Sequence, residues 1–238
     1  MRSAIRGGLI LATLLAATAA AEVESGISPA NKLYQQAVVE GDRASKLERR
    51  GKRPAAIDAY ELAGQLSEAS IAEAERTGLR EEERPPEVYF RCAASYLHAG
   101  RLLSQKKEED GDEVRCDKLL AKAESFLSQV EKVELARAQR ANGPINPEIW
   151  RVRNASGYVS FLRGELAQAR LHYESVLELN PTYKPAEQAI AEINQLEQRE
   201  NELFTPQGRT LQKEKNRKVL REIVKTLRLV RDIVTLGR

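Results

Sequence analysis

Apolar residues recur every three or four positions along most of the chain, which is the period that places them on one face of an α-helix. Helical segments of about 12 to 25 residues follow one another from Pro29 to about Phe204, and none alternates with the two-residue period of a strand. Turn signals rich in Gly, Pro, Asn and Asp separate these segments, at Gly51–Pro54, Gly78–Pro86, Glu108–Asp112, Asn142–Pro147, Gly164, Asn180–Pro185 and Thr205–Gly208. The pattern predicts an all-α chain of antiparallel helical hairpins.

The clearest repeating unit begins at Trp150. Small, aromatic, aliphatic and proline positions follow at regular spacing in it, at Gly157, Ala169, Tyr173, Leu177 and Pro181. This spacing resembles the tetratricopeptide repeat, a helix–turn–helix unit of about 34 residues. The resemblance implies that small side chains at Gly157 and Ala169 let the two helices approach, that Tyr173 fills the groove against the next repeat, and that Pro181 ends the second helix. Three polar residues depart from the family pattern at positions usually occupied by large side chains: Arg153, Ser156 and Ser160.

Two further units resemble the same family. One carries first-helix positions at Tyr89, Cys92, Ala93, Tyr96 and Gly100, followed after an insertion by Ala123, Leu127 and Val130. An earlier unit is weaker, with Ala44, Leu47, Gly51, Ala56, Tyr60 and Ala63. The resemblance implies a tetratricopeptide-like helical-hairpin solenoid of about three hairpins over residues 29–204, with an insertion near 101–117. A generic helical bundle with the same spacing by chance is the alternative.

The first 21 residues have the features of a secretory signal. Arg2 and Arg6 precede an apolar run that extends from Gly7 to Ala20, and small residues at Ala19 and Ala21 suit a cleavage site before Glu22. The run is too short to span a bilayer with ease. We therefore expect residues 1–21 to be a signal peptide and the mature chain to be exported, periplasmic or extracellular. No Cys follows the run, so no lipid-attachment site is expected.

The last thirty residues, 209–238, form a basic amphipathic segment. They carry a net charge of +7, whereas residues 22–208 carry −6 and the whole chain +3. Apolar residues repeat at intervals of three and four along one stripe of a helical wheel, at Leu220, Ile223, Leu227, Val230 and Val234. Such a stripe predicts burial, either as a cap on the last repeat, by pairing with a second copy or a partner helix, or on an anionic membrane surface. The export signal argues against a nucleic-acid partner despite the basic charge.

Residues suited to catalysis are scarce. His98 and His172 are the only imidazoles, and nothing in the sequence places either one beside a nucleophile. Phosphate-binding loops, nucleophile elbows and HExxH zinc motifs are all missing from the sequence. The acidic run that ends at Glu113 lacks the ligand spacing of a calcium loop. We therefore predict a protein that is not an enzyme and needs no cofactor or metal.

Cys92 and Cys116 are the only thiols of the chain. An exported protein favours a disulfide between them, but on two long antiparallel helices they would be offset by about 15–20 Å, beyond the reach of a bond. A disulfide would require the first of these helices to end near Gly100. Otherwise we expect two buried small apolar side chains.

By the family resemblance, the first helices of stacked repeats line a concave groove. The resemblance assigns to this groove Arg151, Asn154, Tyr158, Phe161 and Leu162 in the clearest unit, and Glu87, Phe90, Ala94, Leu97 and His98 in the preceding one. The mixture of apolar and polar side chains suits an amphipathic helix or an extended peptide. The alternative is that Phe161, Leu97 and Leu162 are covered by neighbouring helices. Repeat packing is assigned to Ala93, Tyr96, Gly157, Ala169, Tyr173 and Pro181.

The predicted function is that of a non-enzymatic protein–protein interaction scaffold in the cell envelope, binding a partner peptide or helix in the groove. An alternative is an accessory protein of the envelope that its basic C-terminal helix, residues 209–238, tethers to a membrane surface. The residues do not identify the partner.

Overall fold

The computed structural model describes residues 28–80, 83–105 and 112–203, and these residues form helices joined by turns. The helices of the described residues are α2 (Pro29–Arg49), α3 (Arg53–Arg76), α4 (Pro86–Ser104), α5 (Asp112–Ala141), α6 (Ile149–Leu162), α7 (Leu166–Leu179) and α8 (Lys184–Leu203). The predicted all-α hairpin fold is confirmed, because each described helix packs against the next one along the chain. The predicted signal peptide (1–21) and basic segment (209–238) lie outside the described residues.

Local sequence explains where the helices begin and end. The Ser28 hydroxyl caps α2 by accepting a hydrogen bond from the Asn31 amide at 3.3 Å, and a proline opens each of α2, α3 and α4 at the first or second position, where no amide donor is needed. Three turns after helices contain a glycine with positive φ, which a side chain would disfavour: Gly51, Gly78 and Gly164. These are three of the turn signals in the sequence.

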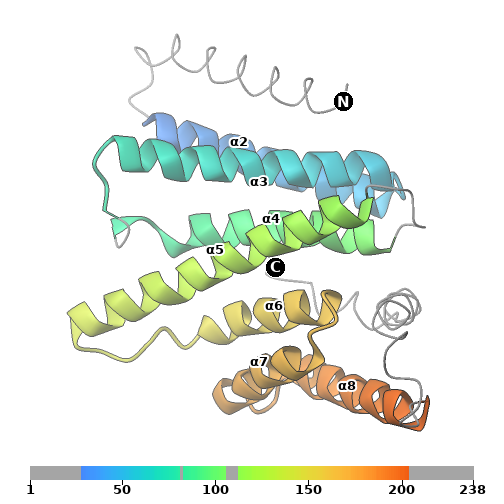
Figure 1. Ribbon diagram of the computed structural model, residues 1–238. Helices are drawn as coiled ribbons and strands as arrows, with labels where there is room; N and C mark the ends of the chain where they lie inside the picture. Colours follow the sequence, from blue (N-terminus) through green and yellow to red (C-terminus); the bar gives the residue numbers. More distant parts are fainter. Residues whose placement is uncertain (1–27, 81–82, 106–111, 204–238) are drawn as a thin grey trace.

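The hairpins stack in chain order, from α2–α3 at the top of Figure 1 through α4–α5 to α6, α7 and α8 at the bottom. One continuous apolar core extends through this stack, from Ala44 on α2 to Leu196 on α8. A small second cluster, formed by Leu33, Ala37 and Leu66, closes the free end of the α2–α3 hairpin. Each hairpin thereby buries part of its apolar surface against the next one in the stack.

Three glycines let neighbouring helices approach closely. A Cβ atom on Gly64 of α3 would lie 2.7 Å from the Tyr96 ring of α4, and one on Gly100 of α4 would lie 2.7 Å from Leu120 of α5. A Cβ on Gly157 of α6 would meet the Tyr173 ring of α7 at 3.0 Å. The close approach at Gly157 is thus to Tyr173, while Ala169 is fully buried one turn earlier on the same helix.

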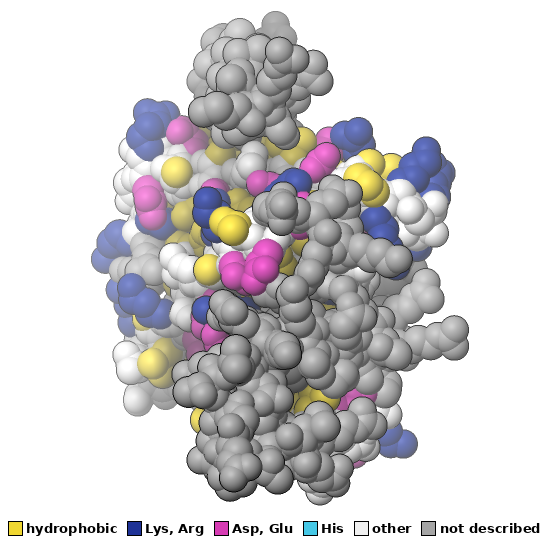
Figure 2. Space-filling view, turned by 45° about the vertical axis from the view of Figure 1, so that its right-hand side comes forward, with side chains coloured by type: hydrophobic (Ala, Val, Ile, Leu, Met, Phe, Trp, Pro, Cys, Tyr) yellow, Lys and Arg dark blue, Asp and Glu magenta, His cyan; other side chains and the backbone are white. Residues whose placement is uncertain are grey.

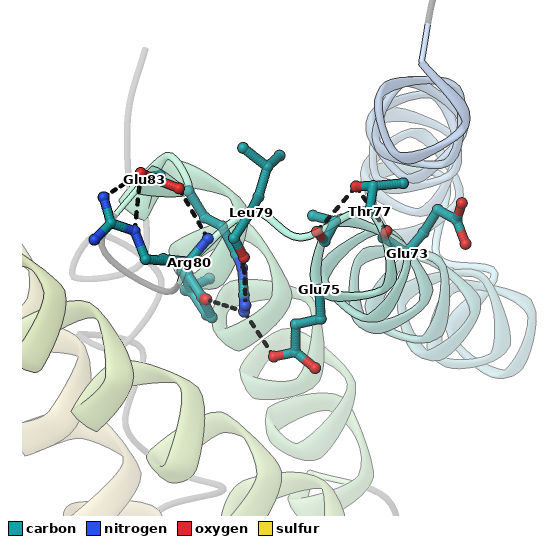
Figure 3. Close-up of polar contacts among 9 residues, drawn as sticks. Glu73, Glu75, Thr77, Leu79, Arg80 and Glu83 are labelled. Carbon is teal, nitrogen blue, oxygen red and sulfur yellow. Dashed lines mark hydrogen bonds and ion pairs between the residues drawn. The ribbon is translucent and has the colours of Figure 1, made fainter.

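The long connection between α3 and α4 is held by one buried arginine. Arg84 donates hydrogen bonds to Glu75 Oε1 at 2.6 Å, to Tyr89 Oη at 2.9 Å and twice to the Leu79 carbonyl. Figure 3 shows the surrounding contacts, including the pairing of Arg80 with Glu83 at the exposed side of the turn. Because the guanidinium donates four hydrogen bonds to three acceptors, it fixes the turn without regular backbone structure.

Helix α8 closes the C-terminal end of the stack. It buries Ala186, Ala189, Ile193 and Leu196 against the core. Its opposite face is polar and exposed, with Glu187, Gln188, Asn194, Gln195 and Gln198. Stacks of helical units typically end in a helix whose outer face is polar. No helix among the described residues is long and apolar enough to cross a membrane.

Candidate functional site: the inner face of α2, α4 and α6

The first helices of the three hairpins, α2, α4 and α6, lie side by side. Arg91 of α4 donates a hydrogen bond to Tyr34 Oη of α2 at 3.3 Å and lies 5.6 Å from the centre of that ring. Arg101 of α4 pairs with Glu48 of α2, and α4 also packs against α6. We call the side formed by these helices the inner face, with Tyr34, Glu48, Phe90, Ala94, His98, Arg101, Arg151, Asn154, Tyr158 and Leu162.

The structure places the predicted groove residues at different depths. Arg151 is exposed, and Phe90 and Leu162 are half-buried against the core. Four more are buried: Leu97, Asn154, Tyr158 and Phe161. Of the remaining three, Glu87 is exposed, and Ala94 and His98 are half-buried. The burial of Leu97 and Phe161 matches the alternative in which the protein's own core covers them. The accessible apolar part of the inner face is therefore smaller than the resemblance implies and consists of Phe90 and Ala94 on α4 and Leu162 at the end of α6.

Most of the residues assigned to helix packing in the sequence analysis are buried in the core. Ala93 and Ala169 are fully buried, and Tyr96 and Tyr173 are each 1% exposed. Pro181 is exposed in the turn after α7, which ends two residues earlier at Leu179. Trp150 packs on Tyr183 with ring centroids 4.7 Å apart.

A polar cluster joins the first two hairpins at the inner face. The Glu48 carboxylate accepts hydrogen bonds from Arg101 and from Tyr60 Oη, the latter at 3.0 Å. The Tyr60 ring stacks on the His98 imidazole with centroids 4.9 Å apart and planes 12° from parallel. No motif in the sequence marks Glu48 or Arg101, because each is an ordinary helix residue until the fold brings them together.

The charges of this cluster shift the pKa values of its members. Burial lowers the pKa of His98 to about 4, and the nearby Arg101 charge adds to this effect. Burial also raises the pKa of Tyr60, and the neighbouring Glu48 carboxylate raises it further. For Glu48, burial opposes ionisation, but the charge and hydrogen bond of Arg101 outweigh it, so the pKa is lowered. Glu48 is therefore ionised and His98 neutral at neutral pH.

Several buried polar atoms of the inner face have no hydrogen-bond partner within the described part of the chain. They are His98 Nδ1, Arg101 Nε, Asn154 Oδ1 and Tyr158 Oη. Arg101 and Glu48 both influence the pKa of Tyr158, which burial raises, so α6 contributes to the same polar region. Buried polar atoms without partners are costly in free energy, which makes this region the least satisfied part of the core.

The two histidines contact different kinds of side chain within the described residues. His98 stacks on a tyrosine ring, and His172 contacts Gln168 at 3.3 Å. Among the residues that the structure describes, no three His, Cys, Asp or Glu side chains gather as a possible metal site. The inner face offers stacking, apolar contact and hydrogen bonds, which are the interactions of a binding surface.

The two cysteines are buried and not bonded to each other. The Cys92 thiol contacts the Gly64 carbonyl at 3.4 Å, and the Cys116 thiol contacts the Gly100 carbonyl at 3.3 Å. Helix α4 continues past Gly100 to Ser104, so the early helix end that a disulfide required does not occur. Burial raises the pKa of Cys92 and keeps its thiol protonated.

Ion pairs on the outer side tie the hairpins to each other. Arg115 of α5 reaches Asp58 and Glu61 of α3, with contacts of 2.9 and 3.0 Å, and Lys122 contacts Glu68 at 2.7 Å. Arg163 pairs with Glu124, and Arg170 with Glu197, farther along the stack. On the face shown in Figure 2, side chains of both charges are interspersed with hydrophobic ones over the described residues.

Comparisons of the chain with protein-family models, with characterised proteins and with solved structures found no match. The class of protein is therefore stated from its own geometry: an all-α stack of helical hairpins with a partly polar inner face. The tetratricopeptide resemblance remains a prediction from spacing.

Proposed function

We propose that the protein is a non-enzymatic scaffold that binds a helix or extended peptide of a partner protein along its inner face. The observation that carries this proposal is the alignment of α2, α4 and α6, which presents half-buried Phe90, Ala94 and Leu162 beside polar side chains. Apolar anchors bordered by polar groups are typical of peptide-binding surfaces. The predicted signal peptide supports a location in the cell envelope for this binding.

The proposal is tested by photo-crosslinking in cells that produce the protein. A photoreactive amino acid replaces Phe90 or Leu162 on the inner face, and Leu171, which is 59% exposed on α7, serves as the matched control. We expect a discrete protein adduct from positions 90 and 162 and none from position 171. Absence of an adduct from both inner positions, or equal labelling from all three, would reject the proposed scaffold function.

A second candidate function is association with an anionic membrane surface. It is favoured by the net charge of +7 in residues 209–238 together with the apolar stripe from Leu220 to Val234. A basic amphipathic helix binds lipid through both contributions, and the electrostatic one weakens with salt. We expect the full chain to sediment with anionic vesicles at low salt and to lose this binding when residues 209–238 are deleted. Sedimentation that is absent at every salt concentration would exclude this function.

A further inference from the structure

Helix α2, the first helix of the stack in Figure 1, packs mainly against α3 and carries a hollow on its outer face. The hollow has a volume of about 500 Å³. We call it the α2 hollow, and its lining residues are Val39, Asp42, Arg43, Lys46, Leu47 and Arg50. Successive members are at most four positions apart, so they form one stripe over about three turns of the helix. Val39 is 64% exposed, and Leu47 packs partly against the core.

The C-terminal end of the α2 hollow is strongly basic. Residues 42–53 carry a net charge of +4, although residues 22–208 as a whole carry −6. The Glu48 carboxylate is already paired with Arg101 of α4, and Glu40 pairs with Arg43. Within the part of the chain that the structure describes, no carboxylate pairs with the other exposed cations, which are Lys46, Arg49, Arg50, Lys52 and Arg53. These charges attract an anionic partner.

The helix dipoles favour only some of these cations. Lys46 and Arg49 lie in the last turn of α2, where the negative end of the dipole favours positive charge. Lys52 and Arg53, in contrast, lie at the start of α3, where the dipole disfavours positive charge, and the first turn of α3 contains no acidic residue. Residues that oppose the local stability of a fold are typical of binding sites.

The shape of the α2 hollow favours a helix of a partner protein as its occupant. Small ligands are usually enclosed by several elements, whereas the lining residues named above all belong to α2. A lipid surface is flat, and the Asp42 carboxylate in the lining repels anionic headgroups. A helix, in contrast, packs along such a stripe with its side chains between those of α2. Val39 and Leu47, about two turns apart, are placed to contact its apolar residues.

We propose that the α2 hollow and the basic turn after it bind an acidic amphipathic helix of a partner protein. The partner helix lies along α2, with apolar residues two turns apart against Val39 and Leu47. Its acidic residues lie beside Lys46, Arg50 and Arg53. None of these five side chains belongs to the inner face, so the inference goes beyond the proposed function and does not depend on it.

The test measures binding of a labelled synthetic peptide to the full chain by fluorescence anisotropy. The peptide is helical, with leucine at every seventh position and glutamate on the flanking positions, and its twin has lysine in place of each glutamate. We expect saturable binding of the acidic peptide that weakens with salt, and none of the basic twin. Lack of binding by the acidic peptide, or equal binding of the two, would overturn the proposal.

Two charge reversals locate the bound peptide. Arg53→Glu and Lys184→Glu are matched, because each replaces an exposed cation at the first residue of a helix. Both should raise the thermal midpoint slightly, since an acidic residue suits that position. Only Arg53→Glu should weaken peptide binding, by about fivefold. Equal affinities would overturn the proposal, because a peptide bound to residues 209–238 instead is insensitive to this reversal.

Two valine substitutions test the apolar part of the contact. Val39 and Val114 are 64% and 59% exposed, and only Val39 lines the α2 hollow. We expect Val39→Ser to weaken peptide binding about fivefold and Val114→Ser to leave it unchanged. Equal affinities of the two variants would contradict the proposed contact. Phosphatidylglycerol vesicles that sediment with the unmodified chain but not with Arg53→Glu would identify a lipid surface as the occupant and would also overturn the proposal.

Discussion

At the scale of single residues, the inner face depends on a few buried polar groups with defined partners. Arg101 is 7% exposed and pairs with the Glu48 carboxylate, with Tyr60 and His98 beside them. Buried charges of this kind are tolerated only when they are paired. Removing either charge of the Glu48–Arg101 pair is therefore expected to lower the stability of the fold more than removing an exposed charge would.

The Glu48–Arg101 pair predicts a large effect of a small change. Glu48→Gln leaves the Arg101 cation buried without a carboxylate and should lower the free energy of unfolding by about 3–5 kcal/mol. The matched control is Glu40→Gln, which breaks an exposed pair with Arg43 and should cost about 0–1 kcal/mol. Urea denaturation of both variants measures the difference. A similar loss in the two would show that Arg101 is not effectively buried.

The neutral state of His98 predicts loss of stability in acid. Its pKa is lowered from 6.5 to about 4 in the folded chain, so between these values the unfolded state binds more protons. The stabilisation is present above pH 6.5 and is lost as the pH falls toward 4, by about 3.5 kcal/mol at about 1.4 kcal/mol per pKa unit.

His98→Gln should therefore flatten the dependence of unfolding free energy on pH in this window. His172→Gln, at a histidine that burial affects less completely, serves as the control and should retain most of the slope. The measurement is urea denaturation at several pH values from 4 to 7. An unchanged slope in His98→Gln would contradict the burial of a neutral imidazole.

At the scale of helices, close packing at glycines sets how the hairpins meet. Gly64 of α3 has the Tyr96 ring of α4 where its own Cβ would lie, and a rigid ring cannot move aside as a flexible chain end can. Gly41 of α2, in contrast, has no atom within 4 Å of a Cβ position. The two glycines occupy helix interiors but differ in what surrounds them.

This difference predicts opposite effects of one substitution. Gly64→Ala should destabilise the protein by about 1–3 kcal/mol because the added methyl overpacks the α3–α4 contact. Gly41→Ala should stabilise it by about 0.5–1 kcal/mol because alanine favours the helix. Thermal denaturation of the two variants checks the signs. Stabilisation by Gly64→Ala would mean that α3 and α4 are farther apart than described.

At the scale of the whole molecule, each helix is stabilised mainly by contacts with the helices next to it in the stack. Helix α8 packs on α7, whereas α2 packs on α3 at the other end of the core. In such a linear arrangement, one end can open while the other remains folded. Unfolding is therefore expected to begin at an end of the stack.

Ile193→Ala tests this expectation at the C-terminal end. Ile193 of α8 is fully buried against the core, and the cavity left by its truncation should cost about 2–5 kcal/mol locally. Hydrogen exchange should accelerate in α7 and α8 and change little in α2 and α3. Ala191→Ser, at an exposed position of the same helix, is the control. Uniform acceleration across all helices would indicate a single cooperative unit instead.

The hairpin order and most helix ends could be predicted from the sequence. Periodicity is a local property, and Gly51, Gly78 and Gly164 occupy turns because only local backbone conformation decides this. The family resemblance assigns Phe90 and Leu162 to the inner face, and this assignment stays a prediction. The burial of Asn154 and Tyr158, in contrast, depends on distant helices and could not be read from the sequence.

By itself, the sequence determined that this chain is all-α, where its helices turn, and that small residues recur where helices meet. Only the tertiary structure decided that Glu48, His98 and Arg101 form one cluster, and that Arg84 holds the α3–α4 turn. The physical reason is range: helix periods and turns are set by neighbours in the chain, whereas charge pairing and burial are set by residues brought together by packing.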